Sequence, residues 1–257
     1  MNSPCIEVRH VSKTFRDGGG TVAALHDVSF AAQPGEFITI IGPSGSGKST
    51  LFNLLTGLTQ ADTGEILING AAVGRRTGLV GYMPQRDLLL PWRTIVNNVI
   101  LGPELDGHSK KQARQQAREL MPLFGLAGFE NAYPDTLSGG MRQRAALLRT
   151  FLTGRDVLLL DEPFGALDAL TRRELQRWLL DVWQRFQKTI LFITHDVEEA
   201  VFLADRVLVF SPRPGRISKE LAVKLPRPRQ GISLVSEELR RLEAELMAAL
   251  EAGSDGG

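Results

Sequence analysis

A glycine-rich stretch at residues 42–50 constrains this chain more than any other feature. It reads Gly-Pro-Ser-Gly-Ser-Gly-Lys-Ser-Thr and fits the phosphate-loop template, Gly-x-x-x-x-Gly-Lys-Ser/Thr, at every position. The apolar run 37–41 precedes it and predicts a buried strand. A helix is predicted to follow, because four leucines share one helical face: Leu51, Leu54, Leu55 and Leu58. Strand, glycine loop and helix form the arrangement that holds a nucleoside triphosphate.

The residue types explain why such a loop binds phosphate. Glycines let several backbone N–H groups turn toward one anion, and the positive end of the helix dipole adds to that field. Lys48 is placed to reach the β- and γ-phosphates, and the Ser49 hydroxyl to ligate Mg²⁺. A glycine-rich turn that fits by chance is the alternative, which both flanking elements disfavour. We therefore predict a site for ATP or GTP. The predicted binding residues are Gly42, Pro43, Ser44, Gly45, Ser46, Gly47, Lys48, Ser49 and Thr50.

Composition and charge exclude other classes of protein. The 257 residues include 30 Lys and Arg against 29 Asp and Glu, a net charge of +1, so we expect no nucleic-acid partner. Cys5 is the only cysteine, which argues against a disulfide framework or a cysteine-based zinc site. No apolar run approaches the roughly 18 residues needed to span a bilayer, and the first five residues do not resemble a signal peptide. We expect a cytoplasmic protein that a partner can hold at a membrane.

Alternating apolar runs and helical patterns predict the fold. Strands are predicted at 6–15, 25–30, 37–41, 65–68, 80–83, 157–161, 189–193 and 206–210, with a hairpin turn at Asn69-Gly70. Helices are predicted at 110–124, 141–152, 172–186 and 237–251. The fold class is α/β: a phosphate-loop NTPase core with a mainly parallel sheet, an N-terminal antiparallel β region and an inserted helical subdomain.

Three regions follow from this pattern. The nucleotide-binding core with its N-terminal β region is predicted at 1–84 and 156–215, the helical subdomain at 85–155, and a C-terminal linker and helix at 216–257. Pro226-Arg227-Pro228-Arg229 predicts an extended linker. The leucine spacing of the last helix would allow pairing with another helix, but two heptads are too few for a coiled coil, which favours a solvated terminal helix.

Polar residues follow two of the predicted buried strands. Asp161 and Glu162 end the run 157–161, and the carboxyl ends of parallel strands face the ligand crevice. Asp161 is then placed to hold Mg²⁺, and Glu162 to orient and polarise an attacking water. Solvated acids at a strand end are the alternative, which the phosphate loop makes improbable. His195 follows the strand 189–193 and is placed to donate a hydrogen bond to a γ-phosphate.

A second glycine motif, Ser138-Gly139-Gly140, stands directly before a predicted helix. A helix N-terminus with a hydroxyl donor predicts a second anion-binding cradle. A helix-ending turn is the alternative for a Gly-Gly pair, but it does not explain why this pair opens a helix.

These motifs, in this order, resemble the ATPase subunit of ATP-binding cassette (ABC) transporters. The correspondence gives Walker A at 42–50, the Q-loop at Gln85, the signature at 137–143, Walker B at 157–161 with Glu162 next, the D-loop at 165–168 and the switch histidine at His195. The match covers roughly residues 5–215, and six ordered motifs leave chance little room.

The resemblance implies further roles. Phe15 stands where the family places a tyrosine that stacks on adenine, and stacking needs a ring face rather than a hydroxyl. Gln85 would contact Mg²⁺ or the attacking water, and Asp168 would act across a dimer interface. In the family, two subunits sandwich two ATP molecules, each between one Walker A and the partner's signature, here Ser138, Gly139 and Gly140. The implied catalytic residues are Glu162, His195, Gln85 and Lys48, and the Mg²⁺ ligands are Ser49, Gln85 and Asp161.

One departure points to a subgroup. Met141 stands where the commonest signature has glutamine. This signature variant, taken together with the segments 88–94 and 161–168, is similar to that of the nitrate, sulfonate and taurine importer group. This implies ATP hydrolysis at the cytoplasmic face of the inner membrane. It would energise uptake of a small anionic solute through a permease that an extracytoplasmic solute-binding protein serves. The segment 88–92 then either lines a groove for a permease helix or is core of the helical subdomain, and both interpretations stand.

Two other functions fit parts of the chain. A cassette ATPase without a permease would usually carry two cassettes or a long coiled-coil insertion, and this chain has neither. A small-molecule kinase would use the same phosphate loop but leaves Ser138-Gly139-Gly140 unexplained.

Overall fold

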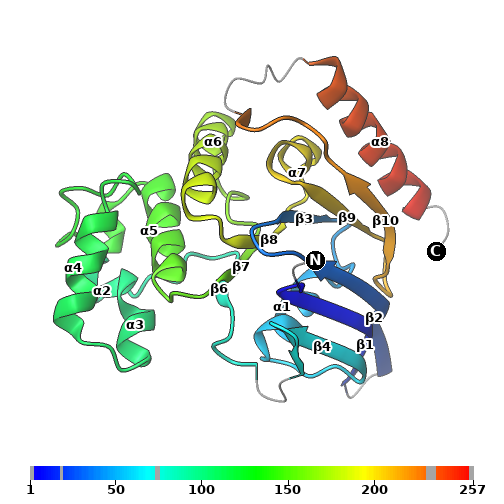
Figure 1. The fold of residues 1–257 in the computed structure, drawn as a ribbon, viewed down its shortest axis with the longest axis horizontal. Coiled ribbons are helices and arrows are strands. Elements are labelled where there is room, and N and C mark those ends of the chain that lie inside the picture. Colours follow the sequence, from blue (N-terminus) through cyan, green and yellow to red (C-terminus); the bar gives the residue numbers. More distant parts are fainter. Residues whose placement is uncertain (1–2, 18–19, 73–75, 230–235, 255–257) are drawn as a thin grey trace. The chain divides into compact units, whose positions relative to one another are not determined.

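The computed structural model describes residues 3–17, 20–72, 76–229 and 236–254 (Figure 1). The chain divides into two compact units, which are described separately: unit 1 comprises residues 1–80 and 186–257, and unit 2 comprises residues 81–185. Met1 and Asn2, two of the five residues on which the signal-peptide expectation rests, lie outside the described residues, as do 230–235 and 255–257 of the predicted tail. The domain boundaries drawn from the sequence remain a prediction.

Unit 1 begins with an antiparallel sheet. Its strands, in the order β2-β1-β4-β5, are β2 (Gly20–Ala32), β1 (Ile6–Asp17), β4 (Thr63–Ile68) and β5 (Ala71–Ala72). All its neighbouring strands run antiparallel. Asn69 (φ 51°) and Gly70 (φ 75°) join β4 to β5 in left-handed conformations, as a two-residue hairpin turn requires. The predicted antiparallel β region and its hairpin are confirmed.

A second set of strands in unit 1 carries the glycine loop. Its strands are β3 (Phe37–Ile41), β8 (Thr189–Ile193), β9 (Arg206–Phe210) and β10 (Ile217–Ala222). β8 and β9 pair with β3 in parallel, and β10 adds to β9 antiparallel. Every residue of β3 and β8 is buried, as continuous apolar runs predict. The helices of unit 1 are α1 (Lys48–Thr56), α7 (Val197–Leu203) and α8 (Glu237–Ser254).

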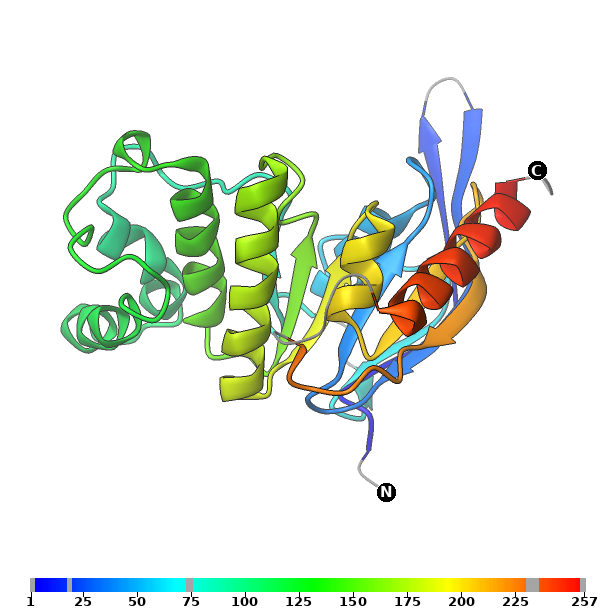
Figure 2. The same cartoon turned by 90° about the horizontal axis from the view of Figure 1, so that it is seen from above.

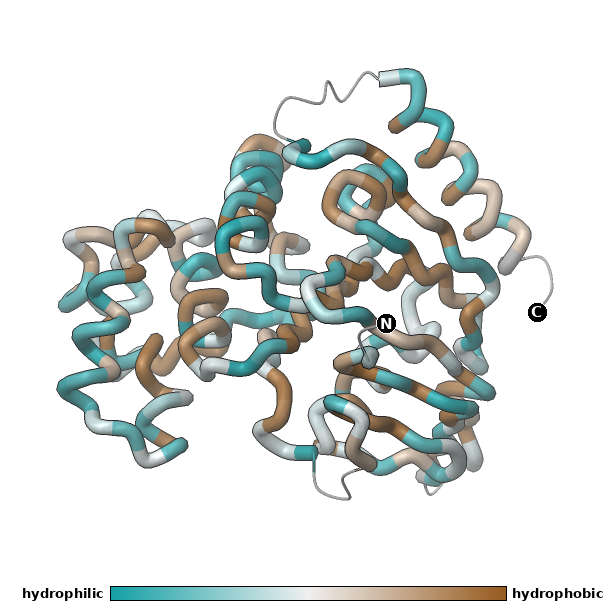
Figure 3. Tube along the Cα trace, in the orientation of Figure 1, coloured by the Kyte–Doolittle hydropathy of each residue, from teal (hydrophilic) through white to brown (hydrophobic). Residues whose placement is uncertain are grey.

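Unit 2 holds a parallel strand pair and most of the helices. β6 (Gly81–Met83) pairs with β7 (Val157–Asp161). The helices are α2 (Ile95–Val99), α3 (Leu101–Leu105), α4 (Lys110–Leu120), the 3₁₀ turn η1 (Pro134–Thr136), α5 (Gly139–Phe151) and α6 (Ala169–Phe186). α4, largely hydrophilic in Figure 3, ends before the predicted residue 124, because Pro122 has no N–H with which to continue the helical hydrogen bonds. Parallel strands, an antiparallel sheet and a helical segment together confirm the predicted α/β class.

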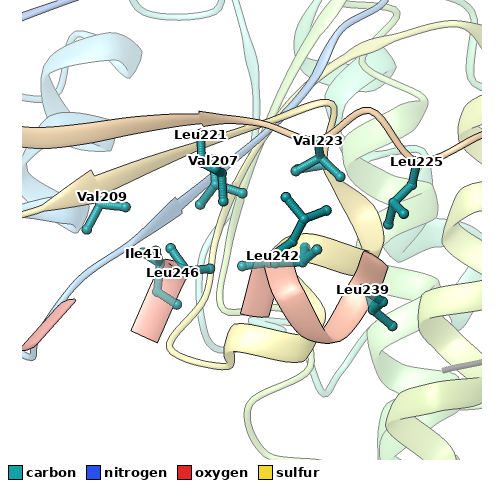
Figure 4. Close-up of a cluster of buried hydrophobic side chains, with 12 residues drawn as sticks. Ile41, Val207, Val209, Leu221, Val223, Leu225, Leu239, Leu242 and Leu246 are labelled. Carbon is teal, nitrogen blue, oxygen red and sulfur yellow. The ribbon is translucent and has the colours of Figure 1, made fainter. Parts of the chain in front are cut away.

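The terminal helix α8 differs from its prediction. Hydrophobic and hydrophilic stretches alternate along it (Figure 3), and Leu239, Leu242 and Leu246 are at most 4% exposed. They join a buried cluster with residues of α7, β9 and β10 (Figure 4). In both ribbon views α8 lies beside α7 and β10 (Figures 1 and 2). The expectation of a solvated helix is wrong, because its leucine stripe covers apolar side chains of unit 1, each burial worth roughly 1.5–3 kcal/mol.

Among the described residues, none of the helices combines the length and the apolar character required to cross a membrane.

The packing of α8 yields a first prediction. Leu246→Ala should lower the free energy of unfolding by about 2–5 kcal/mol, the usual cost of a leucine-to-alanine cavity, measured by urea denaturation. Met247→Ala is the matched control. The Met247 side chain is 47% exposed, so its removal should lower the free energy of unfolding by less than about 0.5 kcal/mol. Equal stability of both variants would show that α8 does not pack on unit 1.

Candidate active site

The loop between β3 and α1 has a conformation that only glycine allows. Gly45 (φ 76°) and Gly47 (φ 92°) are left-handed, and a Cβ on Gly47 would lie 2.6 Å from the carbonyl oxygen of Ala24. Gly47 is the N-cap of α1, and within the described chain no side chain caps this helix and no acidic residue lies in its first turn. A glycine N-cap offers no side-chain acceptor to the first turn of α1, and such a helix start suits an external anion.

The ammonium group of Lys48 lies inside this loop. Its side chain is buried, and Nζ donates to the carbonyl oxygens of Gly42 (2.8 Å) and Pro43 (2.9 Å). A further bond reaches Oγ of Ser46 (3.3 Å). These acceptors hold a positive charge beside the positive end of α1. The predicted residues 42–50 thus form one cradle within unit 1, and its electrostatics fit a phosphate group.

Sequence reasoning missed a segment that supports the loop. Nε of Arg213 donates to the carbonyl oxygen of Gly45 (3.1 Å). A Cβ on Gly215 would lie 1.9 Å from the carbonyl oxygen of Ser46, so the chain after β9 approaches the loop as closely as glycine permits. These contacts join residues about 170 positions apart, and no local pattern indicates them.

Two more predicted residues of unit 1 are accessible. His195 follows β8 and is exposed, one residue before Asp196, which caps α7 by accepting a hydrogen bond from the N–H of Glu199 (3.0 Å). Phe15 lies on β1 with an exposed ring, and Nζ of Lys13 is 5.4 Å from the ring centroid. An exposed aromatic ring is available for stacking.

In unit 2 the predicted catalytic residues follow β7. Asp161 is buried at the strand end, and the hydroxyl of Tyr82 donates to its Oδ2 (3.5 Å). Burial and the Asp161 carboxylate raise the pKa of Tyr82 to about 12, so the phenol stays a proton donor at neutral pH. Glu162 is left-handed (φ 45°), and Nε2 of Gln85 donates to its Oε2 (3.0 Å). The structure thus brings Gln85 and Glu162 together.

The signature residues open a helix, as predicted. Ser138 is the N-cap of α5, its Oγ accepts from the N–H of Met141 (3.3 Å), and Gly139 and Gly140 are the first helical residues. The hydroxyl keeps its own O–H as a donor. Asp168 has a similar role for α6, since its Oδ1 accepts from the N–H groups of Leu170 (3.1 Å) and Thr171 (3.0 Å). These hydrogen bonds lower the pKa of Asp168, and the bond from the N–H of Thr171 has the largest effect.

Two arginines that sequence reasoning did not select connect α5 to the Q-loop. The guanidinium of Arg149 donates to the carbonyl oxygens of Leu88 (2.7 Å) and Asp87. Arg142 pairs with the carboxylate of Asp87 (3.3 Å) and donates to the carbonyl oxygen of Leu137 (2.7 Å). The segment after Gln85, with Leu88 left-handed at φ 44°, is therefore anchored on the signature helix.

The chemistry of the predicted metal ligands fits Mg²⁺. In the part of the chain that the structure describes, no group of three or more His, Cys, Asp or Glu side chains is placed to hold a metal ion. Ser49, Gln85 and Asp161 supply hard oxygen donors instead, and Mg²⁺ usually takes one or two protein ligands and completes its shell with water and substrate phosphates.

The anchor on the Q-loop gives a second prediction. Arg149→Met leaves two acceptor carbonyls without their donor, which costs about 1–3 kcal/mol, so the amides of Leu89 and Leu90 should exchange with solvent roughly 10-fold faster. Hydrogen-exchange mass spectrometry of the peptide around 86–92 measures this. Arg155→Met is the control, since it removes only a partly exposed ion pair with Asp106. Unchanged exchange in Arg149→Met would contradict the anchoring.

Comparison with known proteins agrees with this geometry. Residues 25–165, more than half of the chain, match the ABC transporter family. The chain is 41% identical to the aliphatic sulfonates import ATP-binding protein SsuB of Bacillus cereus, over 92% of this chain and 93% of that protein. It is 44% identical to the nitrate import ATP-binding protein NrtD of Synechocystis, over 86% and 83%.

A solved structure has the same fold. It is the dimeric structure of an ATP-binding cassette in a post-hydrolysis state, bound to ADP and phosphate. It matches with a TM-score of 0.75 and 29% identity over 86% of this chain and all of that one. With the glycine cradle, the Ser-Gly-Gly helix start and these similarities in place, the chain belongs to the ABC transporter family as an ATP-binding protein.

Proposed function

We propose that this protein is the ATP-hydrolysing subunit of an importer, coupling ATP + H₂O → ADP + phosphate to the uptake of a small anionic solute. The observation that carries the proposal is the cradle at residues 42–50, where the Lys48 ammonium and the uncapped start of α1 present one positive centre. Relatives that import aliphatic sulfonates and nitrate support the importer class and the sulfonate- or nitrate-like solute.

The residue roles follow from the chemistry of each side chain. Lys48 binds the β- and γ-phosphates, and Phe15 stacks on the adenine. Ser49, Gln85 and Asp161 hold Mg²⁺, which neutralises phosphate charge when it is bound. Glu162 orients and polarises the attacking water. Its carboxylate accepts a hydrogen bond from Nε2 of Gln85 at Oε2 (3.0 Å). His195 donates a hydrogen bond to the γ-phosphate.

The working form is a homodimer. We assign Ser138, Gly139 and Gly140 to the γ-phosphate of the ATP held by the partner's Walker A loop, and Asp168 to the interface between the subunits. The exposure of Ser138, the N-cap of α5, supports this assignment, and the similar solved cassette is dimeric. Bound ATP favours the closed dimer because its γ-phosphate contacts both subunits. Hydrolysis removes that contact and shifts the population toward the open form.

A permease converts closure into transport, so the protein works at the cytoplasmic face of the inner membrane. An extracytoplasmic solute-binding protein takes part only through that permease. A cavity of about 400 Å³ in unit 2 is lined by Gln85, Leu88 and Arg142 among others. Further along the same segment, Trp92 is 72% exposed, while Leu89 is buried. We assign Leu88 and Trp92 to docking of a permease helix and Leu89 to the core of unit 2.

The rival functions differ in their products and partners. A small-molecule kinase would release a phosphorylated metabolite instead of free phosphate, and a permease-free cassette would purify without membrane subunits. Neither rival uses both features found here, a capped signature helix and an exposed tryptophan beside the Q-loop.

A third prediction concerns Glu162. Glu162→Gln should retain ATP binding but hydrolyse ATP at least about 100-fold more slowly, the scale of a lost general base, and should accumulate as an ATP-bound dimer in size-exclusion chromatography. Lys48→Ala should lose ATP hydrolysis and form no such dimer, and Glu119→Gln on the exposed face of α4 serves as the charge-matched control. A monomeric Glu162→Gln in excess ATP would refute the sandwich arrangement.

A fourth prediction concerns Trp92. Trp92→Ala should keep the wild-type melting temperature, because the side chain is largely exposed, and should copurify with the membrane permease in reduced yield. Leu105→Ala, at a position 78% exposed on α3, should copurify like the wild type. Full copurification of Trp92→Ala would remove this residue from the docking surface.

A further inference from the structure

The C-terminal end of α7 is completed by side chains from other parts of unit 1. Its C-cap, Ala204, is extended (φ −83°, ψ 154°), so the chain leaves the helix without a left-handed turn to satisfy the last carbonyls. Five consecutive carbonyl oxygens accept side-chain hydrogen bonds instead. The bonds are Thr39 Oγ1 to Ala200 (3.1 Å), Arg229 Nη1 to Val201 (3.3 Å), Phe202 (2.9 Å) and Ala204 (2.7 Å), and Arg227 Nη2 to Leu203 (2.8 Å).

Arg227 and Arg229, here called the arginine cap, lie in the stretch that the sequence indicated as a linker. Arg229 is 1% exposed, so its guanidinium hydrogen-bonds the C-terminal carbonyl groups of α7 instead of water. The C-terminus of a helix is its negative end, where a cation is favoured. Burial, followed by the neighbouring charge of Arg227, lowers the pKa of Arg229 to about 10, and the group remains protonated at neutral pH. A fully buried arginine with three helix carbonyls is an anchor rather than a spacer.

The arginine cap also reaches the strand that leads to the phosphate loop. Nε and Nη2 of Arg227 donate to Oδ1 of Asp205 (2.9 and 2.7 Å), and Oδ2 of the same carboxylate accepts from the N–H of Phe37 (2.9 Å). Phe37 begins β3. One carboxylate therefore connects the arginine cap, the end of α7 and the start of the nucleotide-binding strand.

Helix α8 packs against α7 and β3 through apolar side chains. Its leucines share a buried cluster with Ala200, Val201 and Ala204 of the α7 region and with Ile41, the last residue of β3 (Figure 4). Burial, followed by the charges of Glu198 and Asp196, raises the pKa of Glu243 on α8. The C-terminal segment thus contacts α7 both through the arginine cap and through this apolar cluster.

His195 stands immediately before the opposite end of α7. Seven residues make a helix of roughly 10 Å, with a rise of 1.5 Å per residue. The N-cap bond from Glu199 N–H to Asp196 (3.0 Å) and the bond from Asp196 N–H to Thr194 Oγ1 (3.0 Å) join the histidine turn to the first helical turn. We expect so short a helix to move as one body, so that a change at its C-terminus would displace the turn that carries His195.

We propose that Arg229, with Arg227, is a positioning residue for His195: the arginine cap fixes α7 and thereby sets where the histidine ring meets the γ-phosphate. The proposal rests on the role given to His195 in the proposed function. It gives Arg227 and Arg229 an indirect part in catalysis, through the position of α7.

Kinetics of the full-length protein provide the first test. Arg229→Gln should lower kcat for ATP hydrolysis about tenfold, within the roughly 100-fold that a misplacement of about 1 Å can cost, and leave KM for ATP close to wild type. In a His195→Ala background the same change should cause no further loss. Arg229→Lys, which keeps a cationic donor, should recover much of kcat, and Arg241→Gln on the exposed face of α8 should match wild type.

Nuclear magnetic resonance of the histidine rings tests positioning without turnover. The chain has four histidines, so labelled imidazole resonances are resolvable, and His195→Ala assigns the one of interest. Arg229→Gln should shift the His195 resonances and leave those of His10, which pairs with Asp27 on the N-terminal sheet. Should Arg229→Gln not fold, Arg229→Lys and Arg227→Gln carry the same expectation with a smaller shift.

The outcomes separate this proposal from the function on which it rests. Unmoved His195 resonances in the folded variants, or an equal loss of kcat with and without His195, would overturn the positioning role. Wild-type turnover of His195→Ala would instead overturn the role of His195 itself, and the ring resonances would still decide whether the arginine cap positions the turn.

Discussion

A helix start that the protein itself leaves uncapped is the constraint on which the rest of this molecule depends. The first N–H groups of α1 and the Lys48 ammonium concentrate positive charge in a loop that glycine alone can form. Such a loop keeps its shape only on a rigid support. The fully buried strands β3 and β8 provide that support, and Arg213 and Gly215 hold the loop from the chain after β9.

Helix ends recur as the places where backbone polarity is put to use. Ser138 and Asp168 cap α5 and α6 with the side chains that we assign to the second subunit's nucleotide and to the dimer interface. Asp196 caps the helix next to His195. At the far end of that helix, donors come from residues about 25 positions later in the chain. Each of these helix termini therefore serves both the fold and the proposed chemistry.

Local features were predictable, and distant ones were not. The β3-loop-α1 unit, the Asn69-Gly70 hairpin and the helix start at Ser138 follow from residues adjacent in the sequence, so periodicity and turn chemistry predicted them correctly. Arg149 and Arg229 escaped prediction because an arginine in a helix or a proline-rich stretch is typical of solvated surface. The Asp87 partner of Arg149 lies 62 positions away, and the Ala204 partner of Arg229 lies 25 positions away. The leucines of α8 showed an apolar stripe, but spacing alone does not identify what covers it.

Glu162 has a left-handed backbone (φ 45°), a conformation that costs a non-glycine residue about 1–3 kcal/mol. Laboratory selection for heat resistance alone would favour glycine there, since glycine removes that penalty and also the proposed base. A library ranked by melting temperature would then place inactive molecules at its top, so thermal hardening of this cassette needs turnover as a simultaneous criterion.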